Sequence, residues 1–376
     1  MPGHTVLIYH PLYNGRGFSP VQRSWGRYRA AWNLFEDLRL FESIEHVQQR
    51  PAPPEALLSM HSEAYVEHVR RRDAEGTGFL DQRDTAAWRG VFERTLVAVG
   101  GTLEGVALVG SGAATHVFNP GGGLHHAHRD RTAGFCIFND VALAVHRLQD
   151  DFGLRRVAVV DVDGHHGDGT QELLYDQPVL KLSLHQYDGR FFPGTGSIDE
   201  VGWGHGYGYS VNVGLPRHVG DAGYVPAFRA IVPRALRAYR PDVILLNFGV
   251  DGHFADPLVR LWLTTATYRT VAATVHDLAH ELCAGRLIVC GSGGYDPRHV
   301  ARCWATLLAT LTGDLPPLRF SGLPSTSLCA GGDGQPEPWE AGHGTGALSW
   351  PGRFAPLEDR DVPVPEPATL AAALDT

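Results

Sequence analysis

The sequence predicts an α/β protein with a single open, mostly parallel sheet and helices on both of its faces. Short apolar runs recur along the chain, and most of them are followed directly by glycine, aspartate or histidine. Amphipathic helical patterns alternate with these runs. The runs do not alternate apolar with polar residues, as a strand with one wet face would, so both faces of the sheet should be covered by helices.

The predicted elements follow one another along most of the chain. The apolar runs predict strands at Thr5–Tyr9, Val106–Val109, Val157–Val160, Val179–Ser183, Val243–Phe248 and Leu287–Val289. The amphipathic patterns predict helices at Asn139–Leu148, where an Asn or Asp cap precedes the apolar positions, and at Ala227–Tyr239, Thr267–Leu282 and Val300–Leu311. We find no internal repeat. We expect one domain over residues 1–314 and a Pro/Gly-rich C-terminal extension over residues 315–376.

Composition narrows the class of protein. The chain has 376 residues, 43% of them hydrophobic, and a net charge of -9 without a Lys/Arg block, which disfavours nucleic acid as a partner. No apolar run of about 18 residues predicts a membrane span. The N-terminus lacks the pattern of a secretory signal, and the five cysteines form no CxxC pair, so we expect reduced thiols in the cytoplasm.

Unusual polar residues follow three of the predicted strands. Asp161 and Asp163 follow one strand, Asp251 a second and Tyr295 a third. In a parallel sheet the ligand crevice lies outside the carboxyl ends of the strands. Residues two apart share a face of an extended chain, so His165 can join the aspartates. Asp163, His165 and Asp251 would leave an open position on a catalytic zinc ion, although Fe²⁺ or Mn²⁺ also accepts such ligands.

A second cluster contains paired histidines. His125 and His126 follow three consecutive glycines, and nine of the twenty histidines lie between His116 and His205. Glycine lets a backbone approach a substrate closely. Histidine titrates near neutrality, so such a pair can take a proton from water and return it to a leaving group.

These motifs together resemble those of the histone deacetylase family. The similar segments are Gly-Gly-Leu-His-His-Ala, Gly-Phe-Cys, Asp-Val-Asp-Gly-His-His-Gly-Asp-Gly-Thr, Phe-Phe-Pro-Gly-Thr-Gly, Gly-Val-Asp and Gly-Ser-Gly-Gly-Tyr, in that order. The family includes bacterial acetoin-utilisation-type and acetylpolyamine amidohydrolases. The resemblance spans roughly residues 5–311 and implies the arginase-like α/β fold and a metal-dependent amidohydrolase.

The resemblance also implies a role for individual residues. It makes Asp163, His165 and Asp251 the metal ligands and His125 and His126 the catalytic histidines. Asp161 and Asp168 would orient the histidines, and Tyr295 would donate its hydroxyl to the oxyanion. The resemblance further implies substrate-binding residues at Gly134, Phe135 and Phe192, a rim aspartate at Asp84, and a structural K⁺ held near Asp161, Asp163, His165, Ser183 and Leu184.

The implied chemistry is hydrolysis of an amide. A divalent ion polarises the carbonyl and acidifies water, while a phenol hydroxyl helps to hold the tetrahedral oxygen. We assign His126 as the base, which then protonates the departing amine, and His125 as its electrostatic partner or an alternate acid. Different carboxylate partners allow the two histidines to have different pKa values.

Two departures from the family pattern fall beside the ligands. Gly164 stands where an aliphatic or aromatic residue is usual, and Val259 and Arg260 stand where glycine is common. Leu258 at the rim disfavours a polyamine-specific gate, since a cationic substrate would favour a carboxylate there, whereas the net charge of -9 favours a cation.

The predicted substrate is an acylated lysine peptide, with a small acylated amine such as an acetylpolyamine as the alternative. A ureohydrolase of the same fold would need a second-ion ligand where Gly167 stands. A binding module that has lost catalysis is the remaining alternative, and every expected catalytic residue is present. Self-association into a homo-oligomer is left open.

Overall fold

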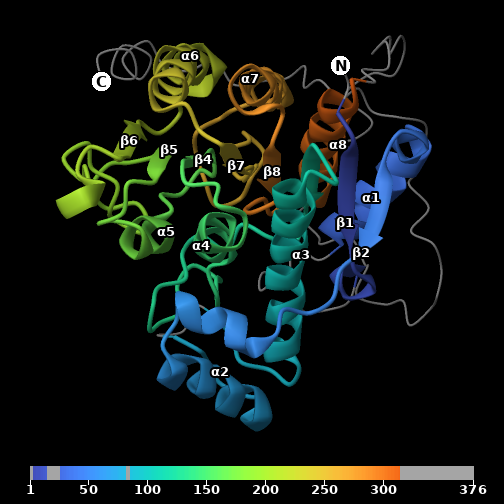
Figure 1. Ribbon diagram of the computed structural model, residues 1–376, viewed down its shortest axis with the longest axis vertical. Helices are drawn as coiled ribbons and strands as arrows, with labels where there is room; N and C mark the ends of the chain where they lie inside the picture. Colours follow the sequence, from blue (N-terminus) through green and yellow to red (C-terminus); the bar gives the residue numbers. More distant parts are fainter. Residues whose placement is uncertain (1–2, 15–25, 82–84, 314–376) are drawn as a thin grey trace, which may run out of the picture.

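The computed structural model describes residues 3–14, 26–81 and 85–313. Eight parallel strands form one open sheet in the order β2-β1-β3-β8-β7-β4-β5-β6 (Figure 1). The strands are β1 (Thr5–Tyr9), β2 (Glu45–Gln48), β3 (His116–Asn119), β4 (Val157–Asp161), β5 (Leu180–Gln186), β6 (Ser210–Leu215), β7 (Val243–Asn247) and β8 (Leu287–Cys290). The predicted fold class is confirmed.

Helices cover both faces of this sheet. They are α1 (Arg27–Asp37), α2 (Glu63–Glu75), α3 (Val91–Ser111), α4 (Asp140–Phe152), α5 (Asp168–Leu173), α6 (Gly220–Tyr239), α7 (Thr265–Cys283) and α8 (Pro297–Thr312). Residues of α1, α6, α7 and α8 share one apolar core, and residues of α2, α3 and α4 share another. Successive residues of a strand point to opposite faces, so Leu7 enters the first core while Val6 and Ile8 enter the second.

One predicted strand is wrong. Val106–Val109 lies inside α3, which ends at Ser111 and is capped by Gly112 with a φ of 78°. A four-residue apolar run fits a buried strand and a buried helix equally well, and the helix here extends over 21 residues. The strand follows it at β3, where His116 and Asn119 mask the apolar pattern. The sequence also did not predict β2, which is short and polar, or β6, where Ser210, Asn212 and Gly214 interrupt the apolar residues.

The four predicted helices are present as parts of α4, α6, α7 and α8. Asn139 is the N-cap of α4, and its side chain accepts a hydrogen bond from the Ala142 N–H, as the sequence indicated. Helix α6 begins seven residues earlier than predicted, because Gly220, Gly223 and Pro226 weaken its pattern. The boundary between residues 314 and 315 stays a prediction, since the C-terminal extension lies outside the described residues.

Candidate active site

Three predicted metal ligands meet at the carboxyl ends of β4 and β7. Candidate ligand atoms of Asp163, His165 and Asp251 lie within 4.8 Å of one another, and all three residues are buried. His165 Nδ1 lies 2.8 Å from Asp251 Oδ2 and 3.1 Å from Asp163 Oδ1. The neighbouring strands β4 and β7 bring the two loops together, with Asp161 paired to Asn247.

The three side chains fit a divalent cation. Asp251 Oδ2 is buried, and no donor among the described residues is aligned to bond it. Burial opposes protonation of His165, but Asp251 and Asp163 together raise its pKa to about 10. Burial and the Asp163 charge raise the pKa of Asp251 to about 6. The buried carboxylates of Asp163 and Asp251 are therefore stabilised by a positive charge between them. A divalent ion supplies this charge in place of the proton on His165.

Backbone and hydroxyl donors hold the carboxylates in place. Asp163 Oδ2 accepts hydrogen bonds from the Ser292 hydroxyl at 3.1 Å and from the Gly293 N–H at 2.9 Å. Asp251 Oδ1 accepts one from the Gly164 N–H at 2.7 Å. These donors come from the loops after β8 and β4, so two strand ends supply the groups that orient the carboxylates.

The tandem histidines each have their own carboxylate. His125 Nδ1 lies 2.7 Å from Asp161 Oδ2, and His126 Nδ1 lies 2.6 Å from Asp168 Oδ1. The two rings are 4.0 Å apart between centroids. His126 also lies 5.7 Å from the His165 ring, so the pair adjoins the Asp-His-Asp group.

The two imidazoles have opposite protonation preferences. Burial opposes charge on His125, yet Asp161 and Asp163 raise its pKa to about 9. Burial and the neighbouring His125 lower the pKa of His126 to about 4, although Asp168 partly offsets them. At neutral pH the site therefore holds one cationic and one neutral imidazole.

A buried aspartate fixes the glycine loop that carries these histidines. Asp140, the first residue of α4, accepts hydrogen bonds from the Gly123 and Leu124 N–H groups and from the Thr102 hydroxyl. The sequence does not reveal that Asp140 binds the glycine loop, because an acidic residue in the first turn of a helix is common.

A second orienting aspartate, Asp256, also escaped the sequence analysis. Its Oδ2 accepts the Tyr295 N–H at 2.8 Å, and its Oδ1 accepts the Leu258 N–H at 2.8 Å. It thereby joins the loop after β7 to the loop after β8. It stands in an Asp-Pro-Leu segment that carries no motif of its own.

Tyr295 lines a cavity of about 270 Å³ together with Asp163, His125 and His126. Burial, with the nearby Asp251 and Asp163 charges, raises the pKa of Tyr295 well above its ordinary value. Its hydroxyl therefore keeps its proton at neutral pH and can donate a hydrogen bond.

The predicted substrate-binding residues have different surroundings. Gly134 and Phe135 line the cavity, and Phe135 meets the Tyr295 ring edge to face at 6.1 Å. Gly134 has a φ of 50°, and a Cβ there would lie 2.3 Å from His126 Cδ2, so only glycine fits. Phe192 is 43% exposed and contacts the His126 ring at 5.0 Å.

Leu258 and Asp84 stand apart from this group. Leu258 is exposed and is not among the residues that line the cavity. Asp84 lies outside the described residues. Their roles at the rim remain predictions.

Arg27 adds a buried positive charge that the sequence analysis missed. It lines the same cavity, and its Nη1 donates hydrogen bonds to the Ser292 and Gly294 carbonyl oxygens at 3.0 and 3.1 Å. It lies far from the other site residues in the sequence, at the start of α1, and lacks a motif of its own.

An open α/β sheet whose strand ends carry an Asp-His-Asp group and carboxylate-paired histidines defines a metal-dependent hydrolase. Comparison with known proteins agrees, because a model of the histone deacetylase domain matches residues 22–311. The chain belongs to the histone deacetylase family, a family of metal-dependent deacetylases. The resemblance seen in the sequence is thus confirmed.

Its relatives include bacterial and archaeal proteins. The acetoin utilization protein AcuC of Bacillus subtilis is 38% identical over 82% of this chain and 82% of its own length. A probable deacetylase of Archaeoglobus fulgidus is 36% identical, over 77% of this chain and 81% of its own. AcuC of Staphylococcus aureus is 33% identical, over 76% and 75%.

Among the described residues, the helices include none with the length and apolarity that crossing a bilayer requires.

Proposed function

We propose that this protein is a zinc-dependent deacylase that removes an acetyl or other short acyl group from the ε-amine of lysine. The observation that carries the proposal is the buried Asp163-His165-Asp251 group beside two histidines of opposite charge preference. A bound divalent ion would polarise the amide carbonyl and acidify water. The ligand set of one nitrogen and two carboxylates suits Zn²⁺, with Fe²⁺ as the alternative.

The histidines divide the proton transfers. His126, neutral at neutral pH, takes the proton from the attacking water at Nε2, because its Nδ1 faces Asp168. The imidazolium then gives this proton to the departing amine. His125 retains its positive charge beside Asp161 and stabilises negative charge in the transition state, or serves as the alternate acid.

Tyr295 and the phenylalanines act on the substrate. The protonated Tyr295 hydroxyl donates a hydrogen bond to the oxygen that becomes negative. Phe135 contacts the Tyr295 ring and Phe192 contacts the His126 ring, which supports a slot for an apolar lysine stem. The released carboxylate is an anion, and the buried Arg27 provides a positive charge in the same cavity.

A structural K⁺ near Asp161 and Ser183 is part of the proposal. These residues pair across β4 and β5, and both are buried. We also assign the protein to the cytoplasm, since Cys136, Cys283, Cys290 and Cys303 are buried free thiols.

A small acylated amine is the second candidate substrate. The net charge of -9 favours a cationic substrate, and the acetoin utilization relatives carry a name from small-molecule metabolism. The exposed Leu258 supplies no carboxylate to select a polyamine. We therefore keep the peptide as the first choice.

A substrate panel tests the proposal. The metal-stripped full chain is reloaded with Zn²⁺ or Fe²⁺ and given acetyl- and longer acyl-lysine peptides and acetylated polyamines. We expect amide hydrolysis that a chelator abolishes and that is fastest on acetyl-lysine. Faster turnover of polyamines moves the substrate to the second candidate, and binding of acyl-lysine without turnover by either metal form overturns the enzymatic proposal.

A further inference from the structure

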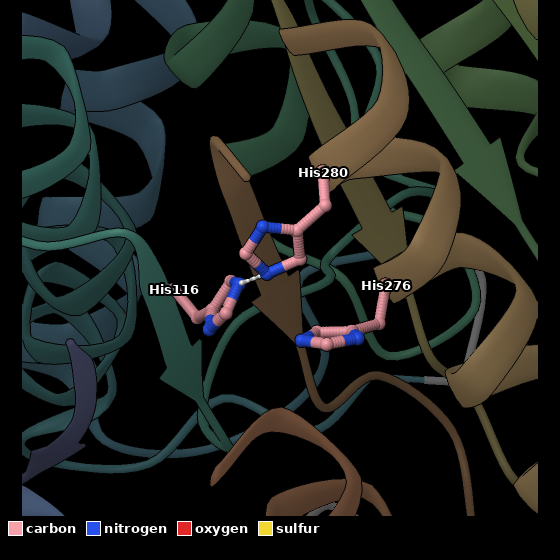
Figure 2. A group of neighbouring side chains, drawn as sticks. All are labelled: His116, His276 and His280. Atoms are coloured by element: carbon pink, nitrogen blue, oxygen red, sulfur yellow. Dashed lines mark hydrogen bonds between the residues drawn. The ribbon is translucent and has the colours of Figure 1, made fainter. Parts of the chain in front are cut away.

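A second group of metal-binding side chains lies away from the catalytic cavity. His116, His276 and His280 each offer a ring nitrogen, and these atoms lie within 4.8 Å of one another. Figure 2 shows the three rings converging from two elements, one from β3 and two from α7. His116 is the first residue of β3, so the group lies at the amino ends of the strands, opposite the catalytic loops.

We propose that His116, His276 and His280 form a second metal site, which takes a divalent transition-metal ion such as Zn²⁺. His276 and His280 are four residues apart, so they share one face of α7. Three imidazoles with an open fourth position are a sufficient ligand set for Zn²⁺. This site is independent of the deacylase chemistry, because none of its residues lines the catalytic cavity.

The distances suit metal coordination. His116 Nε2 and His280 Nε2 are 3.1 Å apart. Two ligand atoms of a tetrahedral zinc ion at about 2.0–2.1 Å from the metal are separated by about 3.3 Å. The ring centroids of His276 lie 4.8 Å from His116 and 4.6 Å from His280, within reach of a side-chain rotation.

His276 has an unused ligand atom. Its Nε2 is buried and has no hydrogen-bond partner among the described residues. A buried imidazole nitrogen without a partner costs free energy, and a bound cation removes that cost. Asp277 Oδ1 lies 3.6 Å from the other ring nitrogen, Nδ1, where a carboxylate compensates positive charge.

Neighbouring groups also set the tautomer of His116. The Thr5 hydroxyl donates to the Leu311 carbonyl oxygen at 3.1 Å and lies 3.2 Å from His116 Nδ1. Because the Thr5 hydroxyl donates its single proton to Leu311, it acts as the acceptor for the Nδ1–H of His116. The His116 Nε2 is then unprotonated, and its lone pair faces His280. Burial and the other two histidines lower the pKa of His116 to about 3, so its ring is neutral, as a metal ligand must be.

A metal here would tie α7 to strand β3. Thr5 in β1 and Leu311 in α8 touch the same group through His116, so the ion would join four elements at this edge of the sheet. A bound ion at this site would therefore stabilise the fold.

Metal stoichiometry tests the inference. The full chain without a histidine tag is stripped of metal, and zinc binding is measured by calorimetry and elemental analysis. We expect two ions per chain for the wild type and one for His276→Ala/His280→Ala. The matched control is His146→Ala, a histidine of α4 paired with Asp150 at i+4, and it should keep both ions.

The Asp251→Asn background isolates the new site from the catalytic one. This variant should bind one ion, and saturating zinc at 100 times Kd should raise its Tm by about 3–4 °C. Adding His276→Ala/His280→Ala should abolish both effects. Should the double alanine variant fail to fold, His276→Gln serves instead. A wild type that binds one ion, or histidine variants that keep two, overturns the inference.

Discussion

At the residue scale, the two catalytic histidines differ in pKa because His126 is buried beside the charged His125, whereas two carboxylates outweigh the burial of His125. His125 faces Asp161 and also approaches Asp163 at 3.8 Å, whereas His126 faces Asp168, which it shares with His128. The shared carboxylate offers less stabilisation to a positive charge on His126. The sequence analysis identified the two histidines and assigned His126 as the base. It could not show how closely each aspartate approaches each histidine.

This division predicts the kinetics of two variants. His126→Ala should lower kcat by about 10²–10⁴-fold on an acetyl-lysine peptide, because the neutral base is lost. His125→Ala should lower it less. For the wild type, activity should rise as pH increases through the His126 pKa and fall as pH rises through that of His125, measured as kcat/KM against pH. Near-normal turnover by His126→Ala, with turnover abolished in His125→Ala, would reverse the assignment.

At the scale of elements, Gly164 and Val259, which both depart from the family pattern, contact each other. Gly164 follows β4 and Val259 follows β7, and the sequence gives no reason to link them. A Cβ at Gly164 would lie 2.6 Å from Val259 Cγ1 and 3.0 Å from Asp251 Oδ1. Val259 is fully buried, so it fills the space that a larger residue at position 164 would need.

The contact predicts a compensating pair of substitutions. Gly164→Ala should destabilise the fold by about 1–3 kcal/mol through overpacking and should weaken metal binding by displacing Asp251. Val259→Ala in the same chain should restore much of the lost stability and of the lost metal affinity. The readouts are urea unfolding and zinc affinity, taken through a double-mutant cycle. Additive effects of the two substitutions would refute the contact as the cause.

At the scale of the whole molecule, buried neutral histidines couple the fold to pH. His61 accepts the Asn139 N–H at Nε2 and faces the His128 carbonyl with Nδ1, and burial lowers its pKa to about 4. Burial, reinforced by His166, lowers that of His185 to about 3. His61 thereby links segments 78 residues apart, and His185 Nε2 faces the Gly196 carbonyl oxygen in the loop after β5.

The direction of the effect follows from proton binding. Between the folded pKa values and the unfolded value of about 6.5, the unfolded chain binds more protons, so the free energy of unfolding falls as pH falls. Each histidine should contribute a loss of about 2 kcal/mol between pH 7 and pH 5. Urea midpoints at both values measure it, and His61→Asn should reduce the difference. A midpoint independent of pH in this range would contradict the prediction.

The sequence by itself determined the parallel sheet, most of its strands and the grouping of the candidate metal ligands with the paired histidines and Tyr295. Strand ends of a parallel sheet meet at one edge, so residues such as Asp163 and Asp251 could be assigned to one site from their order alone. The sequence-based prediction was wrong at Val106–Val109, because a run of four apolar residues is too short to show whether its period is that of a helix or of a strand.

Only the tertiary structure decided which side chains touch. Asp256 bonding Tyr295, Gly164 making room for Val259, and His116 meeting two histidines of α7 all join segments separated by more than thirty residues. Such contacts depend on which strands become neighbours and on how far each loop turns back. Those are properties of the packed molecule, and local residue patterns carry no record of them.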